Sequence, residues 1–162
     1  MSRMTEGRVQ KGMKAPDFCL PDQEGKLHSL ADYSGKKIAL FFYPKDDTPT
    51  CTKEACNLRD NYSLLKKNGF VVLGVSKDNV KSHSKFARKF SLPFPLLSDE
   101  SGSMVEAYDV WGEKELFGRK YMGIFRTTFI IDANGMIADV IQEVDSANHT
   151  EQILSFKART NG

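Results

Sequence analysis

Two cysteines five positions apart, Cys51 and Cys56, are the side chains of this sequence best suited to chemistry. The pattern predicts that Cys51 opens a helix directly after an apolar strand. A helix N-terminus presents free N–H groups and a partial positive charge, and both stabilise a thiolate, which is the nucleophilic form of cysteine. Cys51 is therefore expected to be a reactive thiol. The alternative is a small apolar residue that only fills space where a helix begins.

The loop before Cys51 is polar and stiff. Thr48, three residues earlier, can place a hydroxyl next to the sulfur. Pro44 and Pro49 restrict the backbone and leave the N–H groups of the first helical turn open to a ligand. These features predict a small pocket for an anion or an oxygen atom, with Cys51 at its floor.

Cys56 lies out of reach of Cys51 in a regular helix. Five residues of helix span about 7.5 Å of rise and about 140° of rotation. A disulfide needs Cα atoms within roughly 7 Å of each other and converging Cβ vectors. If the two cysteines react together, the residues from about 50 to 58 must unwind. The alternative is a cysteine on the helix face without a redox role.

The composition indicates one globular domain. The chain has 162 residues, a formal net charge of +2, 40% hydrophobic residues and 27% charged residues, which are ordinary values for a soluble protein. No stripe of basic residues is interleaved with aromatic ones, which argues against nucleic acid as a partner. The longest apolar runs, such as residues 38–43, are too short to span a membrane.

The N-terminal segment, the cysteines and the histidines indicate the expected cellular compartment and argue against a metal site. The first 14 residues lack the apolar segment of a secretory signal, and three cysteines do not form a disulfide framework for a secreted domain, so a cytoplasmic protein is expected. His28, His83 and His149 match no metal-ligand spacing and are expected at the surface. Cys19, between two apolar residues, is expected to pack in the core.

Alternating strand and helix patterns predict an α/β fold, with a mixed central sheet flanked by helices and an N-terminal hairpin extension. Residues 1–12 are expected to form a flexible tail, and residues 13–162 a single domain. Predicted strands cover residues 15–20, 27–30, 38–43, 70–75, 96–97, 127–131 and 136–144. Predicted helices cover residues 50–67, 80–90, 104–108 and 148–159.

The segment between residues 111 and 125 has no predicted element. The run Glu113-Lys114-Glu115 is interpreted as a solvated turn. Four aromatic residues around it could line the pocket or an interaction surface, or could simply pack in a core or a loop: Trp111, Phe117, Tyr121 and Phe125.

The spacing Pro44-x-x-x-Thr48-x-x-Cys51 resembles the active-site signature of peroxiredoxins. The longer run from Thr48 to Cys56, followed by Leu58-Arg59-Asp60, is similar to the bacterioferritin comigratory protein (Q-type) branch of that family. The resemblance covers residues 9–158 and departs from the family in the extra N-terminal tail. Further blocks that carry it are Ala15-Pro16-Asp17-Phe18, Gly74-Val75-Ser76, Pro95-Leu96-Leu97-Ser98-Asp99, the segment 108–114 and the segment 126–132.

The resemblance implies a thioredoxin-like fold and a peroxidase that reduces hydrogen peroxide and organic hydroperoxides. Cys51 would be the peroxidatic residue, oxidised to a sulfenic acid, and Cys56 the resolving residue that forms an intramolecular disulfide with it. The donors to the peroxide oxygens would be the Thr48 hydroxyl, the Cys51 backbone N–H and the Arg126 guanidinium. Glu54, three residues after Cys51, is interpreted as the carboxylate that orients Arg126; the alternative is a glutamate that serves the helix dipole.

The same resemblance implies that thioredoxin, with glutaredoxin as the alternative, reduces the disulfide, that the protein is a monomer, and that no cofactor or metal is needed. Two other functions stay open at this point. One is a thiol–disulfide oxidoreductase, although the four residues between the cysteines differ from the Cys-x-x-Cys spacing typical of that class. The other is a non-enzymatic binding or chaperone-like module on the same fold.

Overall fold

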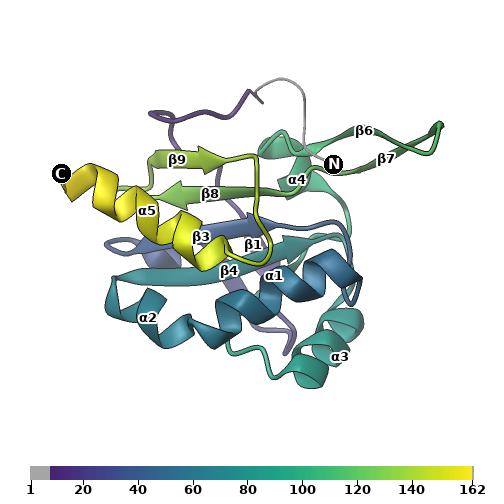
Figure 1. The fold of residues 1–162 in the computed structure, drawn as a ribbon, viewed down its shortest axis with the longest axis horizontal. Helices are drawn as coiled ribbons and strands as arrows, with labels where there is room; N and C mark the ends of the chain where they lie inside the picture. Colours follow the sequence, from purple (N-terminus) through teal and green to yellow (C-terminus); the bar gives the residue numbers. More distant parts are fainter. Residues whose placement is uncertain (1–7, 162) are drawn as a thin grey trace.

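A five-stranded mixed sheet forms the centre of the fold in the computed structural model, which describes residues 8–161 (Figure 1). The strands lie in the order β5-β4-β3-β8-β9. The first three strands in this order are parallel, β8 is antiparallel to β3, and β9 is antiparallel to β8. Their bounds are β3 (Lys37–Phe42), β4 (Phe70–Ser76), β5 (Leu96–Ser98), β8 (Thr127–Ile131) and β9 (Ile137–Ile141). The expected mixed central sheet is confirmed.

Strand β3 shows why its sequence is an unbroken apolar run. Alternate side chains of a strand point to opposite faces of the sheet. Leu40 and Phe42 belong to one hydrophobic cluster, and Ala39 and Phe41 belong to a second cluster on the other face. Both faces of β3 are therefore buried, as in the interior of an α/β sheet.

Helices cover the two faces unequally (Figure 1). The cluster on the Phe41 face contains residues of four helices, α1 (Pro49–Asp60), α2 (Tyr62–Lys67), α3 (Val80–Phe90) and α5 (His149–Asn161). The cluster on the Phe42 face contains residues of the short helices η1 (Leu30–Tyr33) and α4 (Ser103–Ala107). The N-terminal hairpin of β1 (Cys19–Pro21) and β2 (Leu27–Ser29) was expected from the sequence. None of the described helices is long and apolar enough to cross a membrane.

The helix predicted over residues 50–67 is in fact two helices, α1 and α2, which meet at Asn61. The Asn61 backbone leaves helical values (φ −114°, ψ 16°). Its side-chain Nδ2 donates to the Asn57 carbonyl at 2.8 Å. Asparagine side chains compete with the helix backbone for hydrogen bonds in this way, and this competition explains the break.

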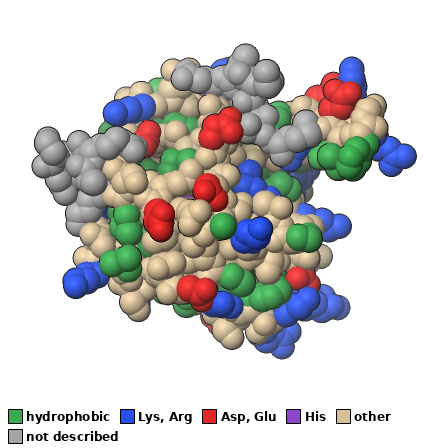
Figure 2. All heavy atoms as spheres, in the orientation of Figure 1, with side chains coloured by type: hydrophobic (Ala, Val, Ile, Leu, Met, Phe, Trp, Pro, Cys, Tyr) green, Lys and Arg blue, Asp and Glu red, His purple; other side chains and the backbone are tan. Residues whose placement is uncertain are grey.

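A second hairpin, which was not predicted, replaces the solvated turn expected at residues 113–115. Strand β6 (Trp111–Leu116) pairs with β7 (Arg119–Ile124). The two linking residues, Phe117 and Gly118, both have positive φ (52° and 79°), as a tight hairpin turn requires. The hairpin projects from the body and carries both hydrophobic and basic side chains (Figures 1 and 2). Its charged run concealed the strand pattern, because only Lys114 of that run is buried.

Part of the segment that was expected to form a flexible tail packs against the domain. Residues 1–7 lie outside the described residues, but residues 8–12 contact the domain. Val9 is buried in the hydrophobic core, and the Gly12 N–H donates to the Ile137 carbonyl at 2.8 Å. The domain therefore begins before residue 13.

Cys19 and the three histidines contradict the exposure expected for them. Cys19 is exposed, because Phe18 takes the core side of the extended chain and its neighbour faces the other way. His28, His83 and His149 are buried, not on the surface. Each of their ring nitrogens has a hydrogen-bonding partner, which is what allows a polar side chain to be buried.

Candidate active site

Cys51 lies in the first turn of α1 and is buried, with 2% of its surface exposed. The helix begins at Pro49 after its N-cap residue Thr48, and its first backbone hydrogen bond runs from the Thr52 N–H to the Thr48 carbonyl at 2.8 Å. The Cys51 N–H comes before that bond and is one of the helix-terminal donors without an intrahelical acceptor. The structure thus places the thiol at the helix N-terminus, where the sequence predicted it.

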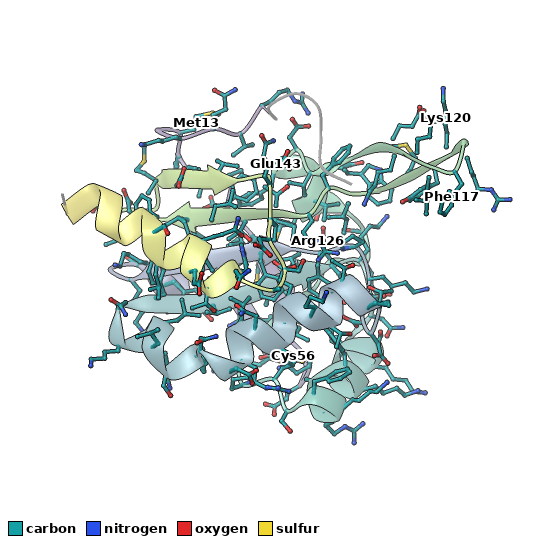
Figure 3. All side chains as sticks on the ribbon, viewed as in Figure 1. Met13, Cys56, Phe117, Lys120, Arg126 and Glu143 are labelled. Carbon is teal, nitrogen blue, oxygen red and sulfur yellow. The ribbon has the colours of Figure 1, made fainter. Side chains whose placement is uncertain are left out.

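Arg126 joins Cys51 to Glu54. Its Nη2 donates to the Cys51 Sγ at 3.2 Å, and its Nη1 donates to the Glu54 Oε1 at 2.7 Å. Arg126 directly precedes β8, so the rigid sheet directs its side chain towards α1 (Figure 3). Arg126 therefore joins three of the sequence-predicted site residues, which lie up to 75 positions apart in the chain.

The surroundings of Arg126 stabilise its positive charge. Burial by itself lowers the pKa of Arg126, but the negative charges of Glu54 and Cys51 and their hydrogen bonds outweigh it, so the pKa is raised. The Glu54 side chain is fully buried, which makes its interaction with the guanidinium stronger than at a surface. A planar guanidinium can donate hydrogen bonds to two acceptors at once, in directions fixed relative to each other. The bond to Glu54 therefore restrains the direction of the Nη2 donor.

Thr48 and Pro44 shape the loop before the helix. The Thr48 hydroxyl donates its proton to the Lys45 carbonyl at 2.9 Å. A hydroxyl has one proton and two lone pairs, so in this state Thr48 can accept a hydrogen bond from a ligand but does not donate one. Pro44 lies at a bend between buried Tyr43 and this turn.

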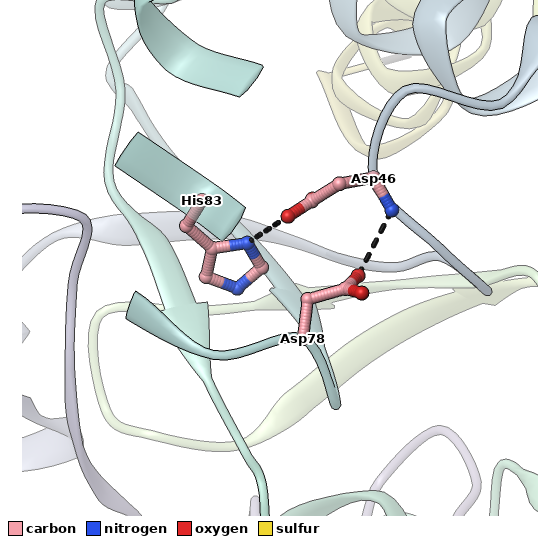
Figure 4. Close-up of side chains that lie close together, drawn as sticks. All are labelled: Asp46, Asp78 and His83. Carbon is pink, nitrogen blue, oxygen red and sulfur yellow. Dashed lines mark hydrogen bonds and ion pairs between the residues drawn. The ribbon is translucent and has the colours of Figure 1, made fainter. Parts of the chain in front are cut away.

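A buried polar cluster, which sequence reasoning missed, anchors the same loop (Figure 4). Asp46 accepts a hydrogen bond from the Tyr43 hydroxyl at 2.6 Å, and its Oδ2 lies 2.7 Å from the Nδ1 of His83 on α3. The Asp46 N–H donates to the Asp78 Oδ2 at 2.9 Å. Burial, followed by the charge of Asp46, raises the pKa of Tyr43 well above its usual value. The cluster ties the Cys51 loop to the end of β4 and to α3.

The same cluster brings three potential metal ligands together. One ligand atom each from Asp46, Asp78 and His83 lies within 4.8 Å of the others. The His83 Nε2 is paired with the Leu97 carbonyl at 2.9 Å, and the Asp78 Oδ2 accepts from the Ser76 hydroxyl at 2.6 Å. Because protein hydrogen bonds already use these groups, the donor set does not favour a metal.

Lys114 is a second basic residue near the thiol, contributed by the hairpin that was not predicted. It is buried, and its Nζ donates to the Ile124 carbonyl at 2.8 Å. Burial lowers the pKa of Lys114, the charge of Arg126 lowers it further, and the charge of Cys51 raises it. A Cβ at Gly123 would lie 3.0 Å from the Lys114 Cδ, so a glycine there leaves room for the lysine stem. The only sequence signal was the charge itself, which was interpreted as solvated.

Cys56 lies on α1 and is half-buried (Figure 3). Both Cys51 and Cys56 are free thiols within an intact helix. The next residue, Asn57, is hydrogen-bonded to the start of α5: its Oδ1 accepts from the Thr150 N–H and its Nδ2 donates to the Ala147 carbonyl, each at 2.8 Å. The helix segment that holds the second cysteine is therefore held from outside as well as by its own backbone.

Comparisons with known proteins cover nearly the whole chain. The model of the AhpC/TSA family matches residues 11–140. Peroxiredoxin Bcp of Escherichia coli K12 is 45% identical over 148 residues, which are 91% of this chain and 95% of the relative. A protein of Coxiella burnetii named as a peroxiredoxin bcp is 52% identical over 146 residues, 90% of this chain and 97% of the relative. A solved structure of the Xanthomonas campestris bacterioferritin comigratory protein, whose description refers to alkyl peroxide reduction, is 31% identical, covers 95% of this chain and 99% of its own, and has a TM-score of 0.83.

Proposed function

This chain belongs to the AhpC/TSA family, among the Bcp (Q-type) peroxiredoxins, and from that premise we propose that Cys51 is the peroxidatic residue of a two-cysteine reaction cycle. The protein is a thiol peroxidase with a thioredoxin-like fold. The observation that best supports this role for Cys51 is the 3.2 Å hydrogen bond from the Arg126 Nη2 to its Sγ at a helix N-terminus. The alkyl peroxide reduction stated for the Xanthomonas relative supports organic hydroperoxides, beside hydrogen peroxide, as substrates.

In the first step, the Cys51 thiolate attacks the hydroxyl oxygen of the peroxide in line with the O–O bond. The S–O bond forms as the O–O bond breaks, so sulfur loses two electrons and the peroxide gains them. Cys51 becomes a sulfenic acid, and the leaving oxygen takes a proton and departs as water or an alcohol. Negative charge moves from the sulfur to the oxygens in the transition state, where donors held in place in advance lower the barrier.

Arg126 and the Cys51 N–H are the donors that we assign to the reacting oxygens. Arg126 already contacts the sulfur, so a small displacement brings the same N–H group to an oxygen bound there. Thr48 accepts a hydrogen bond from the peroxide hydroxyl in the resting arrangement, and it becomes a donor only if its own hydroxyl turns away from the Lys45 carbonyl. Pro44 restrains the loop that carries Thr48, and Glu54 orients Arg126. Lys114 adds a second positive charge near the sulfur.

In the second step, the Cys56 thiol attacks the Cys51 sulfenic acid, releases water and forms an intramolecular disulfide. Because α1 is intact around both residues, residues from about 50 to 58 unwind first. A dithiol partner then reduces the disulfide by thiol exchange. We assign this role to thioredoxin, with glutaredoxin as the alternative, and propose that the enzyme works as a monomer.

The two cysteine roles can be tested by titrating the protein with one equivalent of peroxide and mapping its peptides by mass. We expect a Cys51–Cys56 disulfide in the wild type, a sulfenic acid on Cys51 in Cys56→Ser, and no peroxide consumption by Cys51→Ser. Cys19 is an exposed thiol outside the site, so Cys19→Ser is the matched control and keeps full activity. A Cys51–Cys19 bond, or only intermolecular disulfides, would contradict the proposal.

Thioredoxin-coupled turnover separates this function from the two alternatives. Peroxide-dependent oxidation of reduced thioredoxin, lost in Cys51→Ser, is the expected result. Disulfide exchange without peroxide turnover would instead identify a thiol–disulfide oxidoreductase. The absence of thiol chemistry would identify a binding module.

A further inference from the structure

One carboxylate oxygen of Glu54 has no hydrogen bond. Oε1 accepts from Arg126, whereas Oε2 is buried and lacks a donor. Among the residues whose side chains are described, it is the only buried side-chain nitrogen or oxygen of this kind. Buried polar atoms are nearly always paired, because burial without a partner is unfavourable. A donor directed at Oε2 would complete the pairing of the carboxylate that orients Arg126.

His149 is placed to be that donor. It is the first residue of α5 and is fully buried, and its Nε2 lies 3.5 Å from the Glu54 Oε2. The same Nε2 lies 2.7 Å from the Thr128 hydroxyl, and Nδ1 lies 2.8 Å from the Gln152 Oε1. The His149 ring therefore approaches the unpaired Oε2 from α5, whereas Arg126, which precedes β8, binds Oε1.

The hydrogen-bond network determines which ring nitrogen carries a proton. The Asp145 N–H donates to the Gln152 Oε1 at 2.9 Å, and the Gln152 Nε2 donates to the Glu143 carbonyl at 2.9 Å, so the amide oxygen faces His149. An amide oxygen only accepts, hence Nδ1 is protonated. In the neutral ring Nε2 is then an acceptor and cannot serve Glu54. In the charged ring Nε2 also bears its single proton, which the Thr128 hydroxyl and the Glu54 Oε2 can share as acceptors.

We propose that His149 is a positioning residue for the peroxidatic centre: its charged ring donates from Nε2 to the Glu54 Oε2 and so fixes the carboxylate that aims Arg126 at Cys51. The inference rests on the function proposed above. His149 does not touch the sulfur and acts through Glu54 and Arg126. The chain of contacts runs from the His149 Nε2 to the Glu54 Oε2 at 3.5 Å, from the Arg126 Nη1 to the Glu54 Oε1 at 2.7 Å, and from the Arg126 Nη2 to the Cys51 Sγ at 3.2 Å.

The surrounding charges define the expected pH dependence. Glu54 on α1 favours the charged imidazole, while Arg126, which contacts the other oxygen of Glu54, opposes it. Cys51 is hydrogen-bonded to Arg126, and the charge of Lys114 interacts with that of Arg126. Thr128 and Gln152, the remaining partners of the ring, are uncharged. Because histidine loses its charge as pH rises, the reactivity of each Cys51 thiolate should fall as His149 is deprotonated.

The test measures oxidation of Cys51 by hydrogen peroxide in a Cys56→Ser background, where the reaction stops at the sulfenic acid. Rates are followed by stopped flow from about pH 5 to about pH 9, the range in which histidine titrates, and divided by the thiolate fraction measured by ultraviolet absorbance. We expect the per-thiolate rate constant of the parent protein to fall several-fold as pH rises. His149→Gln, whose amide can donate at every pH, should have a high per-thiolate rate constant that does not change with pH. His149→Leu should have a low per-thiolate rate constant that does not change with pH.

His28→Gln is the matched control, since His28 is also buried and paired with a carboxylate, Asp22, at 2.7 Å, but lies in the β1–β2 hairpin region. It should keep the parent profile. A parent profile that is flat, or a His149→Leu profile that equals the parent at every pH, would overturn the inference while normal sulfenic acid formation still supports the proposed function. Failure of the parent to form a sulfenic acid on Cys51 would overturn both.

A second measurement removes any dependence on the folding of the His149 variants. Nitrogen-15 NMR of the parent protein reports which ring nitrogens carry protons. At the acid end we expect both His149 nitrogens to be protonated, with the Nε2 proton shifted to low field, and we expect Glu54→Gln to abolish that shift. An unprotonated Nε2 across the whole pH range would overturn the inference.

Discussion

The Asn57 side chain on α1 is hydrogen-bonded to Thr150 on α5. Its Oδ1 accepts from the Thr150 N–H and from the Thr150 hydroxyl, each at 2.8 Å. Asn57 follows Cys56 directly, in the segment that is proposed to unwind before the two cysteines can meet. The C-terminal helix therefore stabilises the part of α1 that must open in the proposed reaction cycle.

Asn57→Ala should make this opening easier. Removing the side chain abolishes its bonds to Thr150 and Ala147 and should lower the free energy of local unfolding by about 1–3 kcal/mol. Formation of the Cys51–Cys56 disulfide after a pulse of peroxide should be faster, as measured by quench-flow and intact mass. Overoxidation of Cys51 at high peroxide should decrease, because the sulfenic acid persists for less time.

The matched control for this prediction is Asn68→Ala. Asn68 is the C-cap residue of α2, outside the segment proposed to unwind, and its Nδ2 donates to the Leu64 carbonyl at 2.8 Å. This variant should leave disulfide formation unchanged. Equal rates in the wild type and in Asn57→Ala would show that the contact with α5 does not limit opening.

Arg126→Lys should slow the reaction of Cys51 with peroxide although the positive charge is kept. A lysine ammonium cannot contact the sulfur and the Glu54 carboxylate with the fixed geometry of a guanidinium. Loss of one donor that is held in place for the transition state costs about 10²–10³-fold in rate. Stopped-flow oxidation in the Cys56→Ser background measures the loss. Arg119→Lys, an exposed change on the hairpin, serves as the control, and a rate for Arg126→Lys within the error of this control would contradict the assigned role.

Lys114→Met should lower Cys51 reactivity near neutral pH, and the difference from the wild type should shrink as pH rises. Burial and the charge of Arg126 lower the pKa of Lys114. A lysine is charged below its pKa, so its favourable effect on the thiolate is present at neutral pH and is lost at a lower pH than for an exposed lysine. The thiolate fraction, measured by absorbance against pH, provides the test. Lys120→Met, on the exposed part of the same hairpin, should follow the wild type, and a constant difference for Lys114→Met at all pH values would exclude a charge effect.

Asp46→Asn should destabilise the protein and make the loop before Cys51 less firmly anchored. The change removes the negative charge that His83, Ser82 and Tyr43 contact in a buried site. Mismatched buried groups of this kind cost about 1–3 kcal/mol, measured as the free energy of unfolding in urea. Asp47→Asn alters the adjacent residue, whose ion pair with Lys89 is exposed, and should change stability by less than about 1 kcal/mol. A similar stability for both variants would show that the cluster does not hold the loop.

Much of the fold could be predicted because local patterns agree with the final structure. The helix over residues 80–90 and the strand over residues 127–131 have the predicted bounds. The hairpin β6–β7 was missed because its strands are largely exposed, so buried and exposed residues alternate only weakly along them. The break at Asn61 was missed because it depends on a side-chain hydrogen bond that competes with the helix backbone.

The sequence alone determined the local features of the candidate reactive centre: a thiol in the first turn of a helix, a proline and threonine loop before it, and a second cysteine out of reach on the same helix. These features are local, so the order of residues is enough to define them. Only the tertiary structure decided what surrounds the thiol. Arg126, Lys114 and His149 come from three separate segments, and their positions depend on how the sheet, the hairpin and α5 pack together. The environments of the two Glu54 carboxylate oxygens also depend on the tertiary structure, because the groups around a buried carboxylate come from segments that are distant in the chain.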